Sequence, residues 1–338
     1  MAMCKRFAIW ASTILILVPL AAAQRYRITD LGTFPGGTVS QGNAINFFGQ
    51  VAGYARFANY NAHGALWTEN SGLIDLGAIP PETNFSAAQA INFFGDVAGY
   101  SDYDELEAEH AVLWSQGELH DLGTLPGGSE SQANGINDLG EIAGYSNGAN
   151  ISMHAFLRSR QGGMQDLGTL PGGYYSQGLA INFESEVAGF SNAADGQWHG
   201  FLWSAWSGMQ DLPNLPHAFS ASANGINDLG QVVGGSGSYA VLWHNDKNHT
   251  AECLGILPGL GWSSAFALND AGQVVGWSGF AAFIWSRETG MQDLNQLIPS
   301  NSGWTLSIAN AINVLGQITG QGTINGQQHG FLLTPVFQ

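Results

Sequence analysis

Histidine recurs at one position of a repeated phrase and is the first candidate for chemistry. Five of the nine histidines occupy that position: His63, His110, His154, His199 and His329. Clustered imidazoles are typical of a zinc site, but zinc needs every ligand about 2.0–2.1 Å from one point. Equivalent positions of successive repeats lie too far apart for that. We therefore expect a repeated hydrogen bond at a strand edge, and no metal.

A recurring serine raises the question of a nucleophile. It stands in six repeats and is replaced by Ala221 in a seventh; the six are Ser40, Ser86, Ser131, Ser176, Ser263 and Ser307. No Gly-x-Ser-x-Gly turn, which exposes a catalytic serine, surrounds any of them. We expect a side chain-to-backbone hydrogen bond instead. Cys253 has His249 nearby, but its position is given to Asp in other repeats, which favours a small buried residue.

Acidic side chains supply two further candidates. The turn Asn137-Asp138-Leu139-Gly140 holds one acid, whereas a calcium loop needs several alternating oxygen ligands before its glycine. We expect a turn without a metal. The segment from Asp102 to Glu109 is the one local acidic cluster. We expect a solvated loop, and weak cation binding is the alternative. A glycosidase needs two carboxylates roughly 5–10 Å apart, and this segment holds the only unrepeated carboxylates that could form such a pair.

These residues belong to a unit that is written seven times. The phrase Ala-Ile-Asn-x-x-Gly-x-Val-x-Gly places its Asn at positions 46, 92, 137, 182, 227, 269 and 313. A His-Ala/Gly-Phe-Leu-Trp phrase follows each copy, and Asp-Leu-Gly with a nearby Pro forms a third phrase. Three phrases in a fixed order indicate a repeat architecture.

Each unit predicts four strands. In the third unit these are Ser131–Asn137, Glu141–Tyr145, His154–Leu157 and Gly163–Leu167, which are rich in β-branched and aromatic residues and bounded by Gly, Asn and Asp. Four strands in roughly 40–50 residues are typical of a propeller blade. The expected fold is all-β, a seven-bladed β-propeller with four antiparallel strands per blade. An open β-solenoid is the alternative.

The two ends of the repeated region predict how the ring closes. The last unit stops after its third strand, at Gly330–Phe337, and Arg25–Gly32 is a fourth strand with no unit before it. Joined together, they complete a seventh blade. We therefore expect the N-terminal strand to pair with the C-terminal blade, because an open solenoid would leave strand edges exposed.

The phrases resemble those of a known family. His154-Ala155-Phe156-Leu157, together with Ile-Asn-Asp-x-Gly-x-Val-x-Gly and the stretches Asp121–Gly128 and Asp166–Gly173, resembles the bacterial HAF-type extracellular repeat. The resemblance covers almost the whole chain after residue 23. It implies an exported, propeller-shaped protein of uncharacterised biochemical role, and it brings no catalytic residues with it.

Met1–Ala23 has the features of a secretory signal peptide. Lys5 and Arg6 precede the apolar run Phe7–Leu20, and three alanines stand before the expected cleavage point. The predicted organisation is a signal peptide over 1–23 and a single seven-bladed propeller over 24–338. No later run approaches the ~20 apolar residues of a transmembrane helix. We expect a periplasmic or secreted protein with no membrane span after cleavage.

Charge and composition limit the partners. Nine Lys and Arg stand against 26 Asp and Glu, a formal net charge of −17, so the basic footprint of a nucleic-acid binder is missing. Hydrophobic residues make up 45% of the chain, which excludes a disordered protein. We expect a monomer with no cofactor.

Residues that differ between units are the ones that can select a ligand. Two groups of loops vary most, those between the second and third strands and those joining successive units, and both should emerge on one face. The candidate ligand-binding residues in them are Tyr60, Tyr103, Asp104, Tyr174, Tyr175, Trp198 and Trp262. We expect a non-catalytic binding or scaffolding propeller whose ligand is a glycan or a cell-surface protein. The alternatives are a propeller lyase or glycosidase acting on polysaccharide, and a purely structural surface protein.

Overall fold

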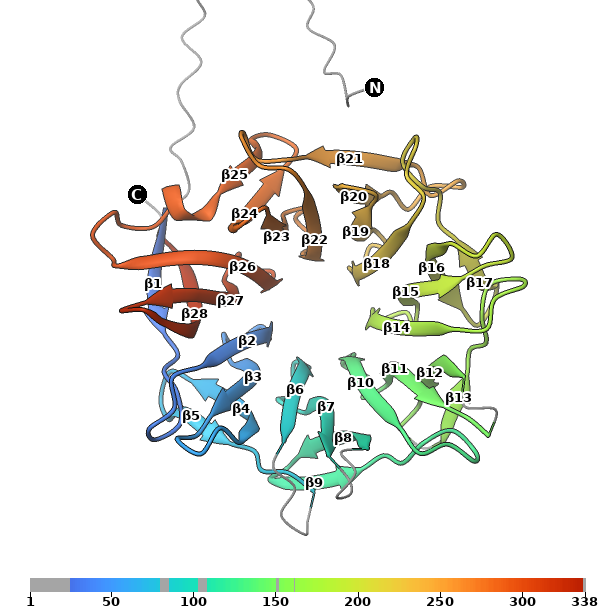
Figure 1. The fold of residues 1–338 in the computed structure, drawn as a ribbon, viewed down its shortest axis with the longest axis horizontal. Coiled ribbons are helices and arrows are strands. Elements are labelled where there is room, and N and C mark those ends of the chain that lie inside the picture. Colours follow the sequence, from blue (N-terminus) through green and yellow to red (C-terminus); the bar gives the residue numbers. More distant parts are fainter. Residues whose placement is uncertain (1–24, 80–84, 103–107, 150–151, 161, 337–338) are drawn as a thin grey trace, which may run out of the picture.

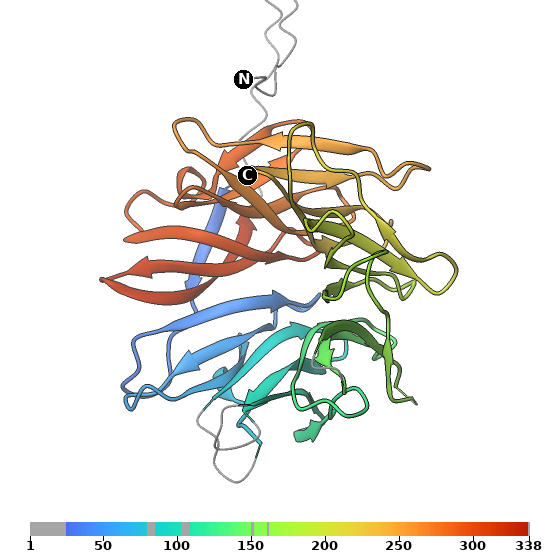
Figure 2. The same cartoon turned by 45° about the vertical axis from the view of Figure 1, so that its right-hand side comes forward.

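The computed structural model describes residues 25–79, 85–102, 108–149, 152–160 and 162–336. Seven four-stranded antiparallel sheets are arranged around a central axis (Figure 1), and the second view shows the twist of each sheet (Figure 2). The predicted seven-bladed β-propeller is confirmed. The segment 1–23 lies outside the described residues.

In blades 1 to 6 the innermost strand comes first along the chain. Blade 1 consists of β2 (Ser40–Ile45), β3 (Val51–Arg56), β4 (Ala62–Thr68) and β5 (Gly72–Asp75). Blade 2 consists of β6 (Ser86–Ile91), β7 (Val97–Asp102), β8 (Glu109–Ser115) and β9 (Glu118–Asp121). Blade 3 consists of β10 (Ser131–Ile136), β11 (Ile142–Asn147), β12 (Met153–Arg158) and β13 (Met164–Asp166). Blade 4 consists of β14 (Ser176–Ile181), β15 (Val187–Asn192), β16 (Trp198–Ser204) and β17 (Gly208–Asp211).

The remaining blades follow the same order. Blade 5 consists of β18 (Ala221–Ile226), β19 (Val232–Ser236), β20 (Tyr239–Trp243) and β21 (Ala251–Gly255). Blade 6 consists of β22 (Ser263–Leu268), β23 (Val274–Ser278), β24 (Ala281–Ser286) and β25 (Gly290–Asp293), followed by the short 3-10 helix η1 (Leu294–Gln296). Blade 7 consists of β26 (Trp304–Ile312), β27 (Ile318–Ile324), β28 (Gln327–Val336) and, from the other end of the chain, β1 (Arg25–Asp30).

The ring is closed by strand pairing between the two ends of the chain. Strand β1 lies antiparallel to β28, with Arg25 opposite Val336 and Asp30 opposite Phe331. The same join is reinforced by a hydrogen bond between His329 Nδ1 and Asp30 Oδ1, which are 2.9 Å apart. The predicted closure is confirmed. Strand β1 pairs with β28, the third strand of blade 7, in the place that a fourth strand of the same repeat takes in every other blade.

The Val-x-Gly step of the repeat lies where two strands approach most closely. In blade 1 the inner strand carries a bulge between Gly42 and Ala44. A Cβ added at Gly53 would lie 1.9 Å from the carbonyl oxygen of Gln41, so no larger residue fits. The Trp114 ring fills space between blades: a Cβ added at Gly64 in the preceding blade would meet this ring at 3.2 Å.

The repeated polar residues have the structural roles expected of them. Five histidines bond the Asp of their own Asp-Leu-Gly phrase at 2.9–3.0 Å, as His63 does with Asp75. That Asp also accepts the N–H of the glycine two residues on, at 2.8 Å in Gly77. Ser86 Oγ accepts the N–H of Gly64 in the preceding blade and donates to the carbonyl of Gly77. The predicted strand-edge hydrogen bond of His and the predicted side chain-to-backbone hydrogen bond of Ser are confirmed.

Two repeated positions depart from the pattern. Ser307 donates to the carbonyl of Gln321 in its own sheet instead of bonding a neighbouring blade, because the bulges in β26 shift its register. Cys253 is half-buried, not fully buried as expected. It lies in β21, the outermost strand of its blade, and an outermost strand has a neighbouring strand on one side only.

Candidate functional site

The variable loops emerge on one face, as predicted. Backbone hydrogen bonds join the two groups of loops within a blade: Arg56 N–H donates to Val39, and Gly279 N–H donates to Trp262. We call this side the loop face. The opposite side, the turn face, carries the Asn-x-x-Gly turns around the central axis and the hairpins between the third and fourth strands.

A cleft of about 530 Å³ opens on the loop face over blade 5. Its two ends are aromatic, with Trp198 from blade 4 and Trp262 from blade 6. Between them lies a floor of small residues: Ser220, Ala221, Ser222, Gly235, Gly237, Ser263 and Ser264. The structure thus brings together two of the seven residues singled out from the sequence, and we call this site the aromatic cleft.

Each end of the cleft is built from packed rings. The Trp198 ring lies edge-on to Tyr175 and Phe190, with centroids 5.3 and 5.5 Å away. At the other end the centroids of Trp262 and Trp277 are 6.4 Å apart. Trp198 remains 41% exposed and Trp262 49% exposed, so both rings keep surface available to a ligand. Edge-on neighbours of this kind fix the orientation of a ring at little entropic cost on binding.

The cleft exists because blade 5 lacks an aromatic side chain that most other blades carry. The residue after Val-x-Gly is Tyr54, Tyr100 and Tyr145 in blades 1 to 3, Phe190 in blade 4 and Trp277 in blade 6, whereas blade 5 has Gly235. Its β19–β20 connection is also only two residues long, at Gly237-Ser238. Our sequence reasoning missed Gly235, Phe190 and Trp277. The signal available was one glycine at a repeat position that is otherwise mostly aromatic.

The lining of the aromatic cleft is uncharged. The floor carries hydroxyl groups, of which Ser222 Oγ donates to Asn224 Oδ1, while Asn224 Nδ2 donates to Ser264 Oγ at 3.3 Å. Apolar walls with a few fixed polar groups are the usual composition of a small-molecule site. The arrangement suits a neutral ligand with a flat apolar side and hydrogen-bonding groups at its edge.

The other sequence-predicted residues lie elsewhere. Tyr60 is 83% exposed on the loop of blade 1, and Tyr174 is 69% exposed before blade 4; neither lines the aromatic cleft. Tyr175 supports Trp198 from behind. Tyr103 and Asp104 lie outside the described residues, so their role stays a prediction.

A second group of interest spans blades 2 and 3 on the loop face. Asp102 and Glu109 are opposite each other in the β7–β8 ladder. Burial raises the pKa of Glu109, and the negative charges of Asp102 and Glu130 add to the rise, although a hydrogen bond from Gln132 opposes it. Burial and the charge of Glu109 also raise the pKa of Tyr100 to about 12. The group is a partly buried carboxylate pair beside a tyrosine that holds its proton.

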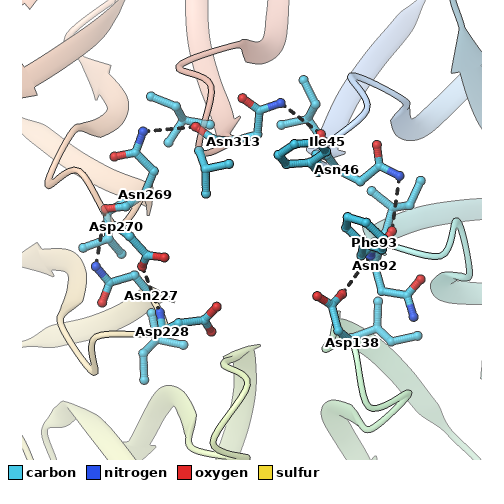
Figure 3. Close-up of a pocket in the computed structure, with 17 residues that line it drawn as sticks. Ile45, Asn46, Asn92, Phe93, Asp138, Asn227, Asp228, Asn269, Asp270 and Asn313 are labelled. Atoms are coloured by element: carbon cyan, nitrogen blue, oxygen red, sulfur yellow. Dashed lines mark hydrogen bonds between the residues drawn. The ribbon is translucent and has the colours of Figure 1, made fainter.

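The central mouth on the turn face is a smaller cavity of about 300 Å³ (Figure 3). A closed belt of seven hydrogen bonds surrounds it, because the Nδ2 of each repeated Asn donates to the carbonyl of the next one, at 2.9–3.4 Å. Three carboxylates also line the mouth: Asp138, Asp228 and Asp270. Within the residues that the structure describes, no group of His, Cys, Asp and Glu is arranged to hold a metal ion.

Comparisons with known proteins support the fold only. No family model matches the chain, and no curated protein matches it. Streptogramin B lyase superposes with a TM-score of 0.58 at 9% identity, over 92% of this chain and 98% of that one. The extracellular domain of a B. thetaiotaomicron protein described as a hybrid two-component system superposes with a TM-score of 0.56 at 11% identity, over 93% of this chain and 40% of that one.

A third solved structure shares less of the chain. TolB from Acinetobacter baumannii superposes with a TM-score of 0.44 at 12% identity, and the aligned part spans 64% of this chain and about half, 51%, of that one. Over the described part of the chain, the structure contains no helix of the length and apolar character that a membrane span requires.

Proposed function

We propose that this protein is a non-catalytic carbohydrate-binding propeller whose site is the aromatic cleft. The observation that carries the proposal is that Trp198 and Trp262, from two different blades, line one cleft with a hydroxyl-bearing floor. The C–H groups on one side of a sugar ring carry partial positive charge and stack on the negative face of an indole. Its hydroxyls then meet polar groups at the edge.

The charge of the protein narrows the ligand class to neutral sugars. The described residues that line the cleft include no acidic or basic side chain, and the formal net charge of the chain is −17. An anionic polysaccharide would meet repulsion and find no cation to pair with. A neutral glycan meets no such penalty.

Two parts of the proposal concern the whole protein. The apolar run ending in three alanines supports export through a signal peptide over 1–23. The repeated His-Ala-Phe and Asp-Leu-Gly phrases support membership of the HAF-type repeat proteins. We propose a monomer, a single propeller over 24–338, at work in the periplasm or outside the cell, where neutral surface glycans are available.

The binding test uses the chain from residue 24 to 338 on an array of neutral and anionic glycans, followed by calorimetry on the best neutral ligand. Trp198→Ala and Trp262→Ala should each weaken binding by about tenfold or more. Gly235→Tyr should abolish binding, because it fills the cleft with the side chain that blades 1 to 3 carry at this position.

The matched control is Trp206→Ala, which removes a tryptophan that is 97% exposed on the turn face. It should bind as the wild type does. Retention of no neutral sugar, or sugar binding that survives Gly235→Tyr, would contradict the proposal.

A polysaccharide-cleaving enzyme is the second candidate, favoured by Asp102 and Glu109. They are cross-strand partners, and the raised pKa of Glu109 is what a general acid requires. If the protein cleaves glycans here, Glu109→Gln should reduce turnover at least a hundredfold and leave binding in the cleft unchanged. An absence of reducing ends after incubation with the array ligands would exclude this second candidate.

A further inference from the structure

The turn face exposes a ring of apolar side chains at the centre of the molecule. The second variable residue of the Asn-x-x-Gly turn is apolar in six of the seven blades, and Glu184 is the exception. The exposed members are Phe48 (63%), Phe94 (72%), Leu139 (46%), Leu229 (55%) and Leu315 (52%). Turn chemistry alone does not require this, because exposed turn positions usually carry polar residues. We call these five residues the apolar crown.

Phenylalanines of blades 1 and 2 make one side of the crown continuous. The ring centroids of Phe48 and Phe93 are 4.9 Å apart, and those of Phe47 and Phe93 are 5.8 Å apart. Phe94 lies edge-on to Phe93 at 5.5 Å. Contiguous exposed apolar surface of this kind marks an interaction surface, whereas single exposed apolar residues elsewhere do not.

The mouth inside the crown carries negative charge. Asp138 accepts the N–H of Phe93, Asp228 accepts that of Phe183, and Asp270 accepts that of Asp228, each through its Oδ1 at 2.8–3.2 Å. Figure 3 shows Asp228 and Asp270 across the mouth from Phe93. Among the described residues that line the cavity, none is basic.

The three carboxylates are exposed and line the mouth, and no hydrogen bond from the described residues reaches their second oxygens. Burial and repulsion from Asp228 raise the pKa of Asp270, which indicates that the two charges are close enough to disfavour each other. A cation seated between them would relieve that repulsion.

We propose that the turn face is a docking site for a protein segment that carries a lysine or arginine flanked by apolar side chains. The basic side chain enters the mouth between Asp228 and Asp270, and the flanking apolar residues pack on Phe48 and Phe94. A cavity of about 300 Å³ is at the small end for a ligand site, and the crown extends beyond it. The partner is therefore larger than a small molecule.

The negative charge of the turn face and of the whole chain disfavours two other occupants of the apolar crown, a second copy of this chain and a membrane surface. A second copy stacked on the turn face would place its own Asp228 and Asp270 against the same pair, which like charges disfavour. A membrane surface with anionic lipids would repel a chain of formal net charge −17.

The test displays a library of short random peptides and selects binders to the propeller. The enriched peptides should share a basic residue beside apolar ones, and a synthetic copy should bind at least tenfold more tightly than the same peptide with Gln in place of its basic residue. Asp228→Asn with Asp270→Asn, which keeps both Oδ1 acceptors, should remove that preference. Phe48→Ser with Phe94→Ser should weaken both peptides.

The matched control is Phe280→Ser, which removes a phenylalanine that is 81% exposed on the loop face; it should leave peptide binding unchanged. Enrichment of peptides without a basic residue, or no enrichment over the Phe48→Ser, Phe94→Ser variant, overturns the proposal. Two further results would overturn the proposal. One is dimerisation, measured by sedimentation, that Phe94→Ser abolishes; the other is binding to neutral phosphatidylcholine vesicles that Phe94→Ser abolishes. Either result would show that a second copy or a membrane, and not a basic peptide, occupies the apolar crown.

Discussion

At the scale of single residues, the repeated polar side chains connect strands and blades. The repeated Asn is buried, at 5% exposure in Asn137, and its oxygen accepts two backbone N–H groups while its nitrogen reaches the next blade. The repeated His bonds the Asp of the outermost strand, and the repeated Ser accepts a backbone N–H from the preceding blade. These repeated His and Ser side chains therefore make hydrogen bonds that hold the ring together.

His199 bonds two carboxylates, those of Asp211 and Asp195. Burial opposes a charge on the His199 ring, but hydrogen bonds to Asp211 and Asp195, at 2.9 and 3.2 Å, outweigh it and raise the pKa of His199. A raised folded-state pKa means that the protonated ring stabilises the fold below its unfolded value of about 6.5, and that this contribution is lost as pH rises through the folded-state pKa.

Asp195→Asn should therefore destabilise the protein at acidic pH and not at alkaline pH. Asp195 itself stays ionised above its lowered pKa, so the comparison is between melting temperatures at about pH 5.5 and about pH 8.5. Glu184→Gln removes one negative charge from the turn face and serves as the control. An equal loss of melting temperature at both pH values would show that the Asp195–His199 pair has no charged component.

At the scale of strands and turns, the Asn-x-x-Gly turn of blade 6 needs its glycine for conformation and not for space. Gly272 has φ +73°, and a Cβ added there meets nothing within 4 Å. Gly272→Ala should lower the free energy of unfolding by about 1 kcal/mol, the cost of a left-handed conformation for a residue with a Cβ. Calorimetric melting measures this loss.

Gly163→Ala is the matched control for Gly272→Ala. Its surroundings are equally open, and its φ lies outside the left-handed region, so the substitution should be neutral or slightly stabilising. A stability loss as large at Gly163 as at Gly272 would contradict the conformational explanation. Blade 4 already accepts one strained turn, with Ser185 at φ +64°.

Strand content was predictable because each repeat presents the same pattern seven times. In blade 3 the expected Glu141–Tyr145 became β11 (Ile142–Asn147), and Gly163–Leu167 became β13 (Met164–Asp166). The shifts are small because turn residues fix the ends. The aromatic cleft was only partly predictable: Trp198 and Trp262 were named from their loops, but their proximity depends on blade 5 being hollow, and repeats reveal what is present more readily than what is missing.

At the scale of the whole molecule, the belt of asparagines fastens each blade to the next. Asn137→Ala removes a donor to Asn182 and to Glu141 and an acceptor for two backbone N–H groups. Because these partners are buried or half-buried, the free energy of unfolding should fall by about 3 kcal/mol. Asn137→Asp keeps the acceptor but sets a carboxylate oxygen against the Asn182 carbonyl, so its loss at neutral pH should be at least as large.

Asn245→Ala is the control for the belt. Asn245 donates to the carbonyl of Leu229 at an exposed position, and its loss should change stability by no more than about 0.5 kcal/mol. Chemical unfolding of the three variants compares them. If Asn137→Asp were as stable as the wild type, the contacts within the turn would be sufficient and the belt between blades would contribute nothing.

Two circular permutants test whether the pairing of β1 with β28 stabilises the closed ring. Arg25 lies opposite Val336, so a short linker from residue 338 to residue 25 turns β28 and β1 into an ordinary hairpin. The first permutant opens the chain between blades, at Gly37–Thr38, so that every blade is continuous. The second opens it in the hairpin between β4 and β5, at Asn70–Ser71, so that β5 becomes the strand supplied from the other chain end.

Both permutants should fold, because each break lies in a loop and leaves every strand whole. Only the second keeps a ladder of backbone hydrogen bonds across the seam. In the first, blades 1 and 7 are held by side-chain packing, by the single bridge between Val39 and Gln328, and by hydrogen bonds that involve side chains, such as Asn313–Asn46, Asn310–Gly42 and Gly330–Ser40. We expect its melting temperature to fall by several degrees and protease to cut it near the seam, while the second melts close to the wild type. Equal melting temperatures would mean that packing and the asparagine belt close the ring by themselves, and that pairing of β1 with β28 is a consequence of closure and not its cause.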